Sequence, residues 1–517
     1  MRNTNTSFLL AVLVAGGTIP AFAEDCAGLK GEKLGGEAAT ISDTKVVAGT
    51  DRQAEHCLVT VRMNDSTLRF ESRLPTSGWN GKLVFLGGGG FRGALFDPDR
   101  PFFSASIRSE RYATMVTNGG YDYPAADPSV RDATYFKAEF AYDPVKLADF
   151  TYISEHRTLP LGKELVRRFY GSAPSKSYFE GCSSGGHDAM MLSQRWPNDF
   201  DGIVARAPAG NFIGLHMQFN RIAKSVRNPA GMLNPAKQKL LADAVLAQCD
   251  KLDGLEDGII SKPAACNYDA TALRCADGAD TGDSCLSDAQ IATVKTVTTP
   301  IATKDGTWSH PGYNFGAENS PKGWGEYVWM NPKFLGGETL QGAFADGFIR
   351  SFITRDPNFD TKTWDANQWM ASLSIIGAMY EAFDPDLSRF KAHGAKLIVW
   401  NGTTDTAVSA RDTSRYYERV VEKLGREAAD DTVELFLAPG VGHCFGGVGP
   451  DQVDLLKALV TWVEQGKPPS QQGIVLAKQT PTGETTMTRP MCKYPAYPRY
   501  KGTGDINVAE NFTCSTE

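Results

Sequence analysis

Residues 181–185, with the sequence Gly-Cys-Ser-Ser-Gly, constrain the fold of this chain more than any other segment. They follow the G-x-S-x-G pattern of a nucleophile elbow, in which glycines let a strand turn sharply into a helix and expose the serine hydroxyl. A strand-like run at 176–180 precedes the pattern, and residues 185–196 have helical character until Pro197. The pattern therefore predicts that Ser183 is a nucleophile. An ordinary surface turn is the alternative.

A cysteine is adjacent to this serine, and another is adjacent to a distant histidine. Cys182 precedes Ser183, and Cys444 follows His443. The chain has ten cysteines, an even number, as expected for disulfide bonding in an oxidising compartment. Pairing neighbours in sequence gives the disulfides Cys26–Cys57, Cys249–Cys266, Cys275–Cys285 and Cys492–Cys514. This leaves Cys182 with Cys444. Other connectivities exist, but this one is the most economical, and it would tie the nucleophile to a base.

Strand-like and helical runs alternate along much of the chain. The expected strands cover residues 81–86, 176–180, 202–205, 395–400 and 433–437, and the expected helices cover residues 185–196, 413–424 and 451–464. Such alternation is typical of an α/β fold with a mostly parallel sheet. Residues 210–385 interrupt it and lack repeated strand–helix units. We expect them to form an inserted lid domain, with residues 24–209 and 386–517 forming the catalytic domain.

The first 23 residues have the pattern of a secretory signal peptide. Arg2 supplies the positive charge, a short apolar run follows, and Ala21 and Ala23 supply the small residues of a cleavage site. No later segment is apolar over enough residues to span a bilayer. The net charge of −7 gives no basic footprint for nucleic acid. We therefore expect a soluble protein, secreted or periplasmic, with neither a membrane nor a nucleic acid as a partner.

The base and the acid of a triad on such a fold follow the serine in the order acid, then histidine. His443 follows the expected strand at 433–437 and is the predicted base, whereas His187 is the alternative on the elbow helix. Asp405 follows the strand at 395–400 and is expected to orient the imidazole. Asp412 is the fallback, and a capping role in a turn is the alternative for Asp405. The other histidines lack a strand-end position and are expected to be ordinary: His56, His156, His216, His310 and His393.

Acyl transfer also requires hydrogen-bond donors for the developing oxyanion. The backbone N–H of Ser184, directly after the nucleophile, is the first expected donor. The second is expected from the four glycines at 87–90, which follow an early strand, with Gly88 or Gly89 as the donor. A flexible turn without this role is the alternative for the glycine loop.

A second candidate site lies in the expected lid. Residues 249–259 space carboxylates and glycine turns as calcium-binding loops do. The expected ligands of one structural Ca²⁺ are the side chains of Asp250, Asp253 and Asp257 and the carbonyl groups of Leu255 and Ile259. The loop is shorter than an EF-hand and lacks its terminal glutamate. A solvated acidic turn is the alternative, and no organic cofactor is expected.

Together these residues resemble the tannase and feruloyl esterase family, which also includes mono(2-hydroxyethyl) terephthalate hydrolases. The family hallmark is a disulfide between the neighbours of the catalytic serine and histidine, matched by Cys182 and Cys444. The calcium loop and the tail segments 489–495 and 500–506 also look familial. The resemblance implies an α/β-hydrolase fold with a lid and a serine carboxylesterase acting on hydroxycinnamic or gallic-type esters.

The substrate region leaves an alternative open, which is activity on terephthalate monoesters. The segment 344–369 is closer in character to feruloyl esterases than to the terephthalate branch. A terephthalate enzyme needs an arginine for the free carboxylate of its substrate. Arg350 or Arg355 could play that part, although surface or structural roles are favoured for both. The sequence predicts no oligomeric state.

Overall fold

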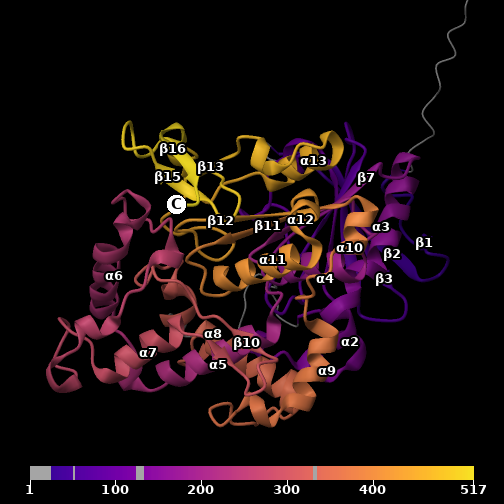
Figure 1. Ribbon diagram of the computed structural model, residues 1–517. Helices are drawn as coiled ribbons and strands as arrows, with labels where there is room; N and C mark the ends of the chain where they lie inside the picture. Colours follow the sequence, from indigo (N-terminus) through magenta and orange to yellow (C-terminus); the bar gives the residue numbers. More distant parts are fainter. Residues whose placement is uncertain (1–24, 51–52, 124–132, 330–334) are drawn as a thin grey trace, which may run out of the picture.

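The computed structural model describes residues 25–50, 53–123, 133–329 and 335–517. The expected signal peptide at 1–23 lies outside the described residues. A mixed sheet of ten strands forms the centre of the molecule (Figure 1). In spatial order its strands are β1 (Lys33–Leu34), β2 (Ala39–Val47), β3 (His56–Met63), β4 (Arg69–Pro75), β6 (Ala113–Thr117), β5 (Lys82–Leu86), β7 (Lys176–Cys182), β8 (Gly202–Arg206), β11 (Lys396–Gly402) and β12 (Val433–Ala438).

The sheet has an antiparallel half and a parallel half. From β1 to β6 each strand runs antiparallel to its neighbour, and from β6 to β12 the neighbours are parallel. All five strands expected from the sequence lie in the parallel half, so these predictions are confirmed. The antiparallel strands β2, β3 and β4 were not predicted.

The parallel strands are buried on both faces, with helices on each side. Alternate residues point to opposite faces of a strand. Val84 and Leu86 of β5 join the same apolar cluster as Leu459, whereas Leu83 and Phe85 join a second cluster with Met191. Burying each such side chain contributes about 1.5–3 kcal/mol. The helices of the first cluster include α1 (Ser106–Ser109) and α13 (Leu455–Gln465), and those of the second are α3 (Ser154–Tyr170), α4 (Ser184–Arg195), α10 (Ser388–His393) and α11 (Ala410–Leu424).

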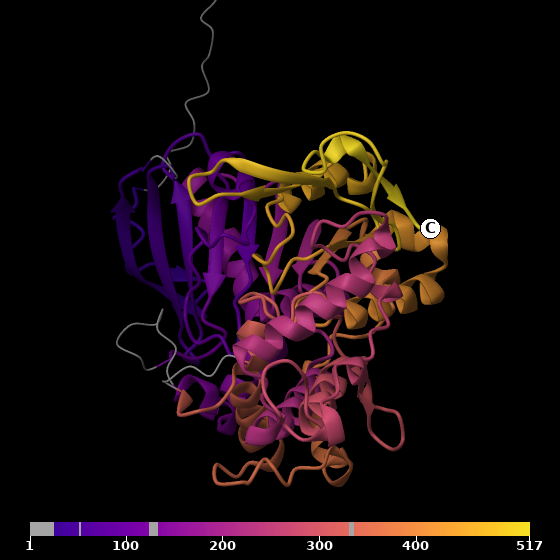
Figure 2. The ribbon, with the colours of Figure 1, turned by 90° about the vertical axis from the view of Figure 1, so that its left-hand side faces the viewer.

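The segment between β8 and β11 contributes no described strand to the central sheet. It consists mainly of helices and irregular turns and lies beside the strand ends (Figure 2). Its helices are α5 (Phe212–Val226), α6 (Pro235–Cys249), α7 (Asp288–Thr298), α8 (Leu340–Gly347) and α9 (Met370–Tyr380), and its two short strands are β9 (Ile301–Ala302) and β10 (Ser309–His310). A third apolar cluster, rich in aromatic rings, joins this segment to Phe91 and Phe140.

All five expected disulfides are present. They join Cys26 to Cys57, Cys182 to Cys444, Cys249 to Cys266, Cys275 to Cys285 and Cys492 to Cys514. After α12 (Arg426–Thr432) and α13, the chain ends in two hairpins, formed by β13 (Val475–Gln479) with β14 (Thr485–Pro490) and β15 (Tyr497–Tyr500) with β16 (Phe512–Ser515). The segment between β8 and β11 is called the lid segment here, after the role expected for it. Buried Arg489 of β14 forms an ion pair with Asp257, which attaches this tail to the acidic loop of the lid segment, residues 249–259.

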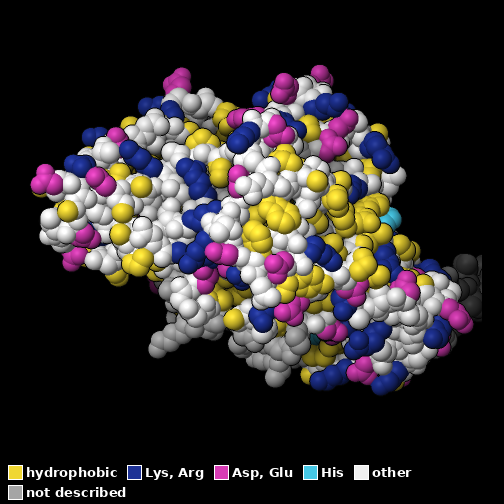
Figure 3. Space-filling model, turned by 90° about the horizontal axis from the view of Figure 1, so that it is seen from below, with side chains coloured by type: hydrophobic (Ala, Val, Ile, Leu, Met, Phe, Trp, Pro, Cys, Tyr) yellow, Lys and Arg dark blue, Asp and Glu magenta, His cyan; other side chains and the backbone are white. Residues whose placement is uncertain are grey.

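The surface agrees with the charge balance of the sequence. Lys and Arg side chains are interspersed with Asp and Glu side chains over the face seen in Figure 3, where hydrophobic side chains gather near the middle. Within the described ranges, no helix is both long and apolar enough to cross a membrane.

The parallel half of the sheet positions every expected catalytic group at one edge. Gly87 follows β5, Ser183 follows β7, Asp405 follows β11 and His443 follows β12. Because these strands are parallel, their carboxyl ends lie at the same edge, which is where open α/β sheets bind ligands. The fold is that of an α/β hydrolase.

Candidate active site

Ser183 occupies a strained turn between β7 and α4. Its backbone has φ +65° and ψ −118°, a conformation that residues other than glycine rarely adopt. The flanking glycines are required by space. A Cβ atom on Gly181 would lie 2.4 Å from the carbonyl oxygen of Gly185, and a Cβ on Gly185 would lie 2.6 Å from the carbonyl oxygen of Gly88. Residues 181–185 therefore form the sharp elbow that the pattern predicts.

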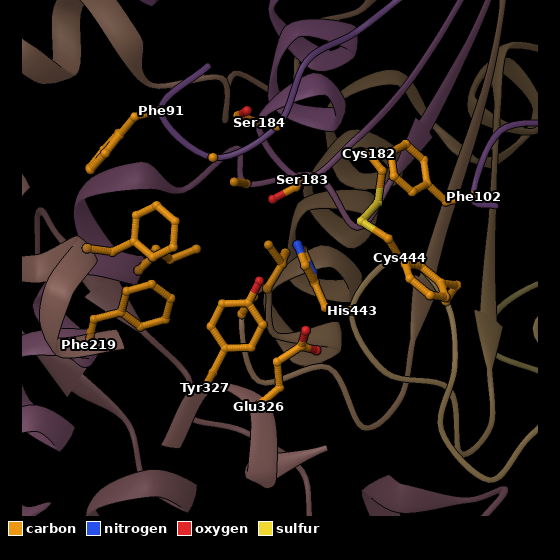
Figure 4. A pocket seen from close by; sticks show the side chains of 18 of the residues that line it. Phe91, Phe102, Cys182, Ser183, Ser184, Phe219, Glu326, Tyr327, His443 and Cys444 are labelled. Atoms are coloured by element: carbon orange, nitrogen blue, oxygen red, sulfur yellow. A yellow bond between two sulfur atoms is a disulfide. The ribbon is translucent and has the colours of Figure 1, made fainter. Parts of the chain in front are cut away.

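A disulfide holds the histidine loop against this elbow. Cys182 and Cys444 are 262 residues apart in sequence, and their Cα atoms are 6.0 Å apart. The side chains of Ser183 and His443, which neighbour the two cysteines, point toward one another (Figure 4). The disulfide thus fixes the backbone beside the nucleophile to the backbone beside the histidine.

Asp405 orients the imidazole of His443. His443 Nδ1 lies 2.8 Å from Asp405 Oδ2, and the other carboxylate oxygen accepts hydrogen bonds from the backbone N–H groups of Ala407 and Val408, at 2.7 and 2.9 Å. With Nδ1 donating to the carboxylate, Nε2 remains as the basic nitrogen on the side of Ser183. Asp412 lies elsewhere and accepts hydrogen bonds from Asn211 and Arg415.

His187 is committed to a structural position. It is fully buried, its Nε2 donates to the carbonyl oxygen of Tyr380 at 2.6 Å, and its ring packs against that tyrosine. Burial lowers the pKa of His187 to about 3, so its imidazole is neutral at neutral pH. Because His187 Nε2 already has an acceptor, it is not available to take a proton from a serine.

The glycine loop after β5 lies against the start of α4. Gly185 N–H donates to the carbonyl oxygen of Gly88 at 3.1 Å, which holds the loop against the elbow. Gly89 and Ser184 line the same cavity as Ser183, whereas Gly88 is not among the lining residues. Of the two glycines expected as donors, Gly89 is therefore the better placed.

A buried ion-pair network underlies the glycine loop. Arg92, three residues after Gly89, is 2% exposed. Its guanidinium donates to Glu155 of α3 at 2.8 Å and to Asp188 of α4. Burial raises the pKa values of Glu155 and Asp188 to about 7, and the nearby Arg92 opposes this rise. The network joins the glycine loop to the helix that begins at the elbow.

Replacing Arg92 with methionine is expected to lower the free energy of unfolding by about 3–5 kcal/mol, because two carboxyl groups would remain buried without their cation. Urea unfolding measured by fluorescence checks the change. Arg426→Met, which removes an exposed ion pair with Asp430, is the matched control and should have a much smaller effect. Equal losses in the two variants would contradict this role of the network.

Ser183 and His443 line a cavity of about 280 Å³. Phe91 and Phe219 lie on one side of Ser183, and Phe102 lies on the other side, beside the disulfide (Figure 4). Other apolar lining residues are Phe96, Phe212, Leu215, Phe344, Ala407, Val408 and Phe445. Aromatic rings on both sides of a nucleophile can pack against an apolar or aromatic part of a substrate.

Five charged or polar side chains of this cavity wall did not stand out in the sequence. His216, expected to be ordinary, lines the cavity together with Arg100, Lys322, Glu326 and Tyr327. Lys322 Nζ donates to Glu326 Oε1 at 2.9 Å. His216 lies on α5, one turn after Phe212, so both residues are on the same face of that helix. The sequence alone does not reveal that this face meets the nucleophile.

The two arginines considered for a substrate carboxylate do not line this cavity. Arg350 forms an ion pair with Asp346 at 3.6 Å and donates to the carbonyl oxygen of Phe359. Arg355 donates to the backbone carbonyl oxygens of Ala141 and Tyr142. The structural roles favoured by the sequence analysis agree with these contacts.

The acidic loop of the lid segment is compact. Asp250 accepts from Gly258 N–H at 2.8 Å, Asp253 from Ser261 N–H at 2.6 Å and Asp257 from Ile259 N–H at 3.0 Å. Oδ1 of Asp250 is buried without a hydrogen-bond partner, and hard carboxylate and carbonyl oxygens suit a calcium ion. Among the described residues, no three His, Cys, Asp or Glu side chains are already gathered as a metal site.

Comparisons with known proteins agree with this geometry. The family described as "Tannase and feruloyl esterase" matches residues 54–515. A mono(2-hydroxyethyl) terephthalate hydrolase of Piscinibacter sakaiensis is 32% identical over 89% of this chain and 85% of its own length. A probable feruloyl esterase B-2 of Aspergillus terreus is 30% identical over 93% of this chain and 90% of its own. The crystal structure of feruloyl esterase B from Aspergillus oryzae superposes with a TM-score of 0.79 at 26% identity, covering 92% of this chain and 97% of the other.

Proposed function

Because the chain belongs to the tannase and feruloyl esterase family and is thus a carboxylic ester hydrolase, we propose that it cleaves esters of hydroxycinnamic or gallic-type acids with Ser183, His443 and Asp405. The observation that carries this proposal is the 2.8 Å hydrogen bond between Asp405 and His443 beside the elbow serine. The aromatic walls of the cavity support the choice of acid.

The proposed reaction proceeds through an acyl-enzyme. Ser183 Oγ attacks the ester carbonyl carbon while His443 Nε2 takes the hydroxyl proton. The N–H groups of Ser184 and Gly89 donate to the oxyanion, and Asp405 stabilises the imidazolium. The carbon–oxygen bond to the alcohol then breaks, and the alcohol leaves with the proton from His443. Water, deprotonated by His443, attacks the acyl group and releases the aromatic acid and free Ser183.

Terephthalate monoesters are the second candidate substrate class. The similarity to the Piscinibacter sakaiensis enzyme favours them. The free carboxylate of such a substrate would require a cation, and Arg100 and Lys322 are the lining residues that carry one. Lys322 is paired with Glu326, and the guanidinium of Arg100 packs over the ring of Phe96. Because both cations are engaged, we favour the hydroxycinnamic or gallic-type esters.

Hydrolysis of methyl ferulate, methyl gallate and mono(2-hydroxyethyl) terephthalate by the purified protein tests this proposal. We expect turnover of methyl ferulate or methyl gallate with a higher kcat/KM than that of the terephthalate ester. Higher kcat/KM for the terephthalate ester would favour the second candidate. No turnover of any of the three by folded protein would contradict an aromatic acyl group as the substrate.

We also propose that the acidic loop binds one structural Ca²⁺ through Asp250, Asp253, Asp257 and the carbonyl groups of Leu255 and Ile259. The unpartnered oxygen of Asp250 supports this ligand set. The ion would brace a turn that the disulfide Cys249–Cys266 already closes. When bound, it would neutralise the charge of these carboxylates, none of which lines the cavity that contains Ser183.

Calcium is expected to raise the melting temperature of the protein, because a ligand that binds only the native state stabilises it by about 2.7 kcal/mol at 100 times its Kd. Asp250→Asn should abolish this shift while keeping an acceptor for Gly258 N–H. Asp243→Asn, an exposed change on α6, should retain it. A melting temperature that is insensitive to calcium and to a chelator would contradict the site.

We propose that the protein acts outside the cytoplasm. The signal-peptide pattern of residues 1–23 and the five disulfides support this placement, because such bonds persist in oxidising compartments.

A further inference from the structure

One buried nitrogen of the active-site cavity has no partner. His216 on α5 is 2% exposed and lines the cavity that contains Ser183. Its Nδ1 lies 2.8 Å from the carbonyl oxygen of Phe212, and a carbonyl oxygen can only accept, so Nδ1 carries the hydrogen. Nε2 is then a bare acceptor, and it has no hydrogen-bond partner. Buried polar groups of native proteins are nearly always paired, so this nitrogen requires an explanation.

The surroundings of His216 are aromatic. Its ring stacks on Phe348 with 4.5 Å between ring centroids and lies near Phe212, Phe219 and Phe91, at 4.2, 5.7 and 6.4 Å. Burial lowers the pKa of His216 to about 3, so the ring is neutral at neutral pH. None of these neighbouring rings offers a hydrogen to Nε2, and a neutral imidazole is no counter-ion for a carboxylate.

His216 lies in the part of the cavity that Phe91 and Phe219 line. Phe91 and Phe219, which flank it, lie on the side of Ser183 away from Phe102 and the disulfide (Figure 4). Because Nδ1 is turned toward the backbone of its own helix, the opposite edge of the imidazole, with Nε2, is turned away from that backbone. An aromatic group that enters beside Phe91 and Phe219 would pack against phenylalanine rings. Nε2 itself is buried, so a substrate hydroxyl reaches this acceptor only by displacing a neighbouring side chain.

We propose that His216 Nε2 accepts a hydrogen bond from a ring hydroxyl of the substrate acid and so selects phenolic acyl groups. This inference rests on the proposed function and refines it. A phenol has the donor that the nitrogen lacks. An unsubstituted ring would leave the nitrogen unpaired, and a site that leaves its own buried polar group unpaired discriminates strongly against such a ligand. The ionised carboxylate of a terephthalate monoester has only acceptors and would be disfavoured.

The test compares kcat/KM for methyl cinnamate, methyl 3-hydroxycinnamate and methyl 4-hydroxycinnamate. We expect the wild type to prefer at least one hydroxylated ester over methyl cinnamate by about 10-fold or more. His216→Phe, which keeps a flat ring but has no acceptor, should lose that preference, measured as the ratio of kcat/KM for each hydroxylated ester to kcat/KM for methyl cinnamate. His216→Gln, whose amide oxygen can accept, should restore part of the preference.

The outcomes separate the two proposals. If the wild type hydrolyses neither these three esters nor methyl ferulate or methyl gallate, the proposed function fails. Suppose the wild type hydrolyses the three esters, and the substitution His216→Phe lowers kcat/KM by the same factor for all three or leaves all three values unchanged. The assignment of His216 is then wrong and the proposed function stands. Should His216→Phe not fold, methyl 4-hydroxycinnamate and 3-hydroxycinnamate are each compared with the matching fluoro ester on the wild type. Fluorine is close in size to hydroxyl but cannot donate, and equal kcat/KM values in both pairs would overturn the inference.

Discussion

Ser183→Ala is expected to lower kcat on an aromatic ester by about 10⁴-fold or more, because the variant lacks the atom that forms the acyl-enzyme. The substitution removes one oxygen and leaves the backbone of the elbow in place, so the melting temperature should change little. Steady-state kinetics on methyl ferulate or methyl gallate, whichever the wild type hydrolyses faster, measure the effect.

A matched control lies on the helix that follows. Ser193 is a buried serine of α4, and its hydroxyl donates to the carbonyl oxygen of Met190 at 2.8 Å. Ser193→Ala should keep kcat within a few fold of the wild type. If Ser183→Ala retained more than about one hundredth of the activity, the nucleophile would have to be another group.

Removing the disulfide between Cys182 and Cys444 with a double alanine substitution is expected to lower kcat by about 100-fold or more. The bond joins residues directly beside Ser183 and His443, and a misplacement of about 1 Å can cost about 100-fold in rate. Kinetics measured well below the melting temperature of the variant separate this loss from unfolding.

The double substitution Cys275→Ala, Cys285→Ala is the control for disulfide loss as such. That bond closes only 10 residues of the lid segment, and neither cysteine lines the cavity. It should change kcat little. Equal kcat in the wild type and in the variant without Cys182 and Cys444 would show that the hydrogen bond to Asp405 and the packing of the loop hold His443 unaided.

The elbow could be predicted from sequence because its requirement is local. Gly181 and Gly185 lie so close to backbone atoms that neither position has room for a Cβ. The sequence therefore has glycine two residues before and two residues after Ser183. The disulfide was predictable for a similar reason, since its cysteines neighbour two residues already singled out. The parallel strands have short apolar runs because both of their faces are buried.

The remaining features depend on contacts between distant segments. Strands β2, β3 and β4 carry polar residues on partly exposed positions, so their sequences lack a continuous apolar run. Arg92 and His216 look like ordinary residues of a loop and a helix until the fold brings Asp188 to the first and the active-site cavity to the second. The choice between Gly88 and Gly89 likewise depended on which of the two faces the cavity.

The most direct test of the account is the mass of the acyl-enzyme. The protein is mixed with methyl ferulate or methyl gallate, quenched with acid within the first turnovers, digested and analysed by mass spectrometry. We predict that the acyl group of the ester is attached to the peptide that contains Ser183, and that Ser183→Ala and samples without ester lack it. Turnover with the acyl group on another residue would contradict the assignment of Ser183 as the nucleophile.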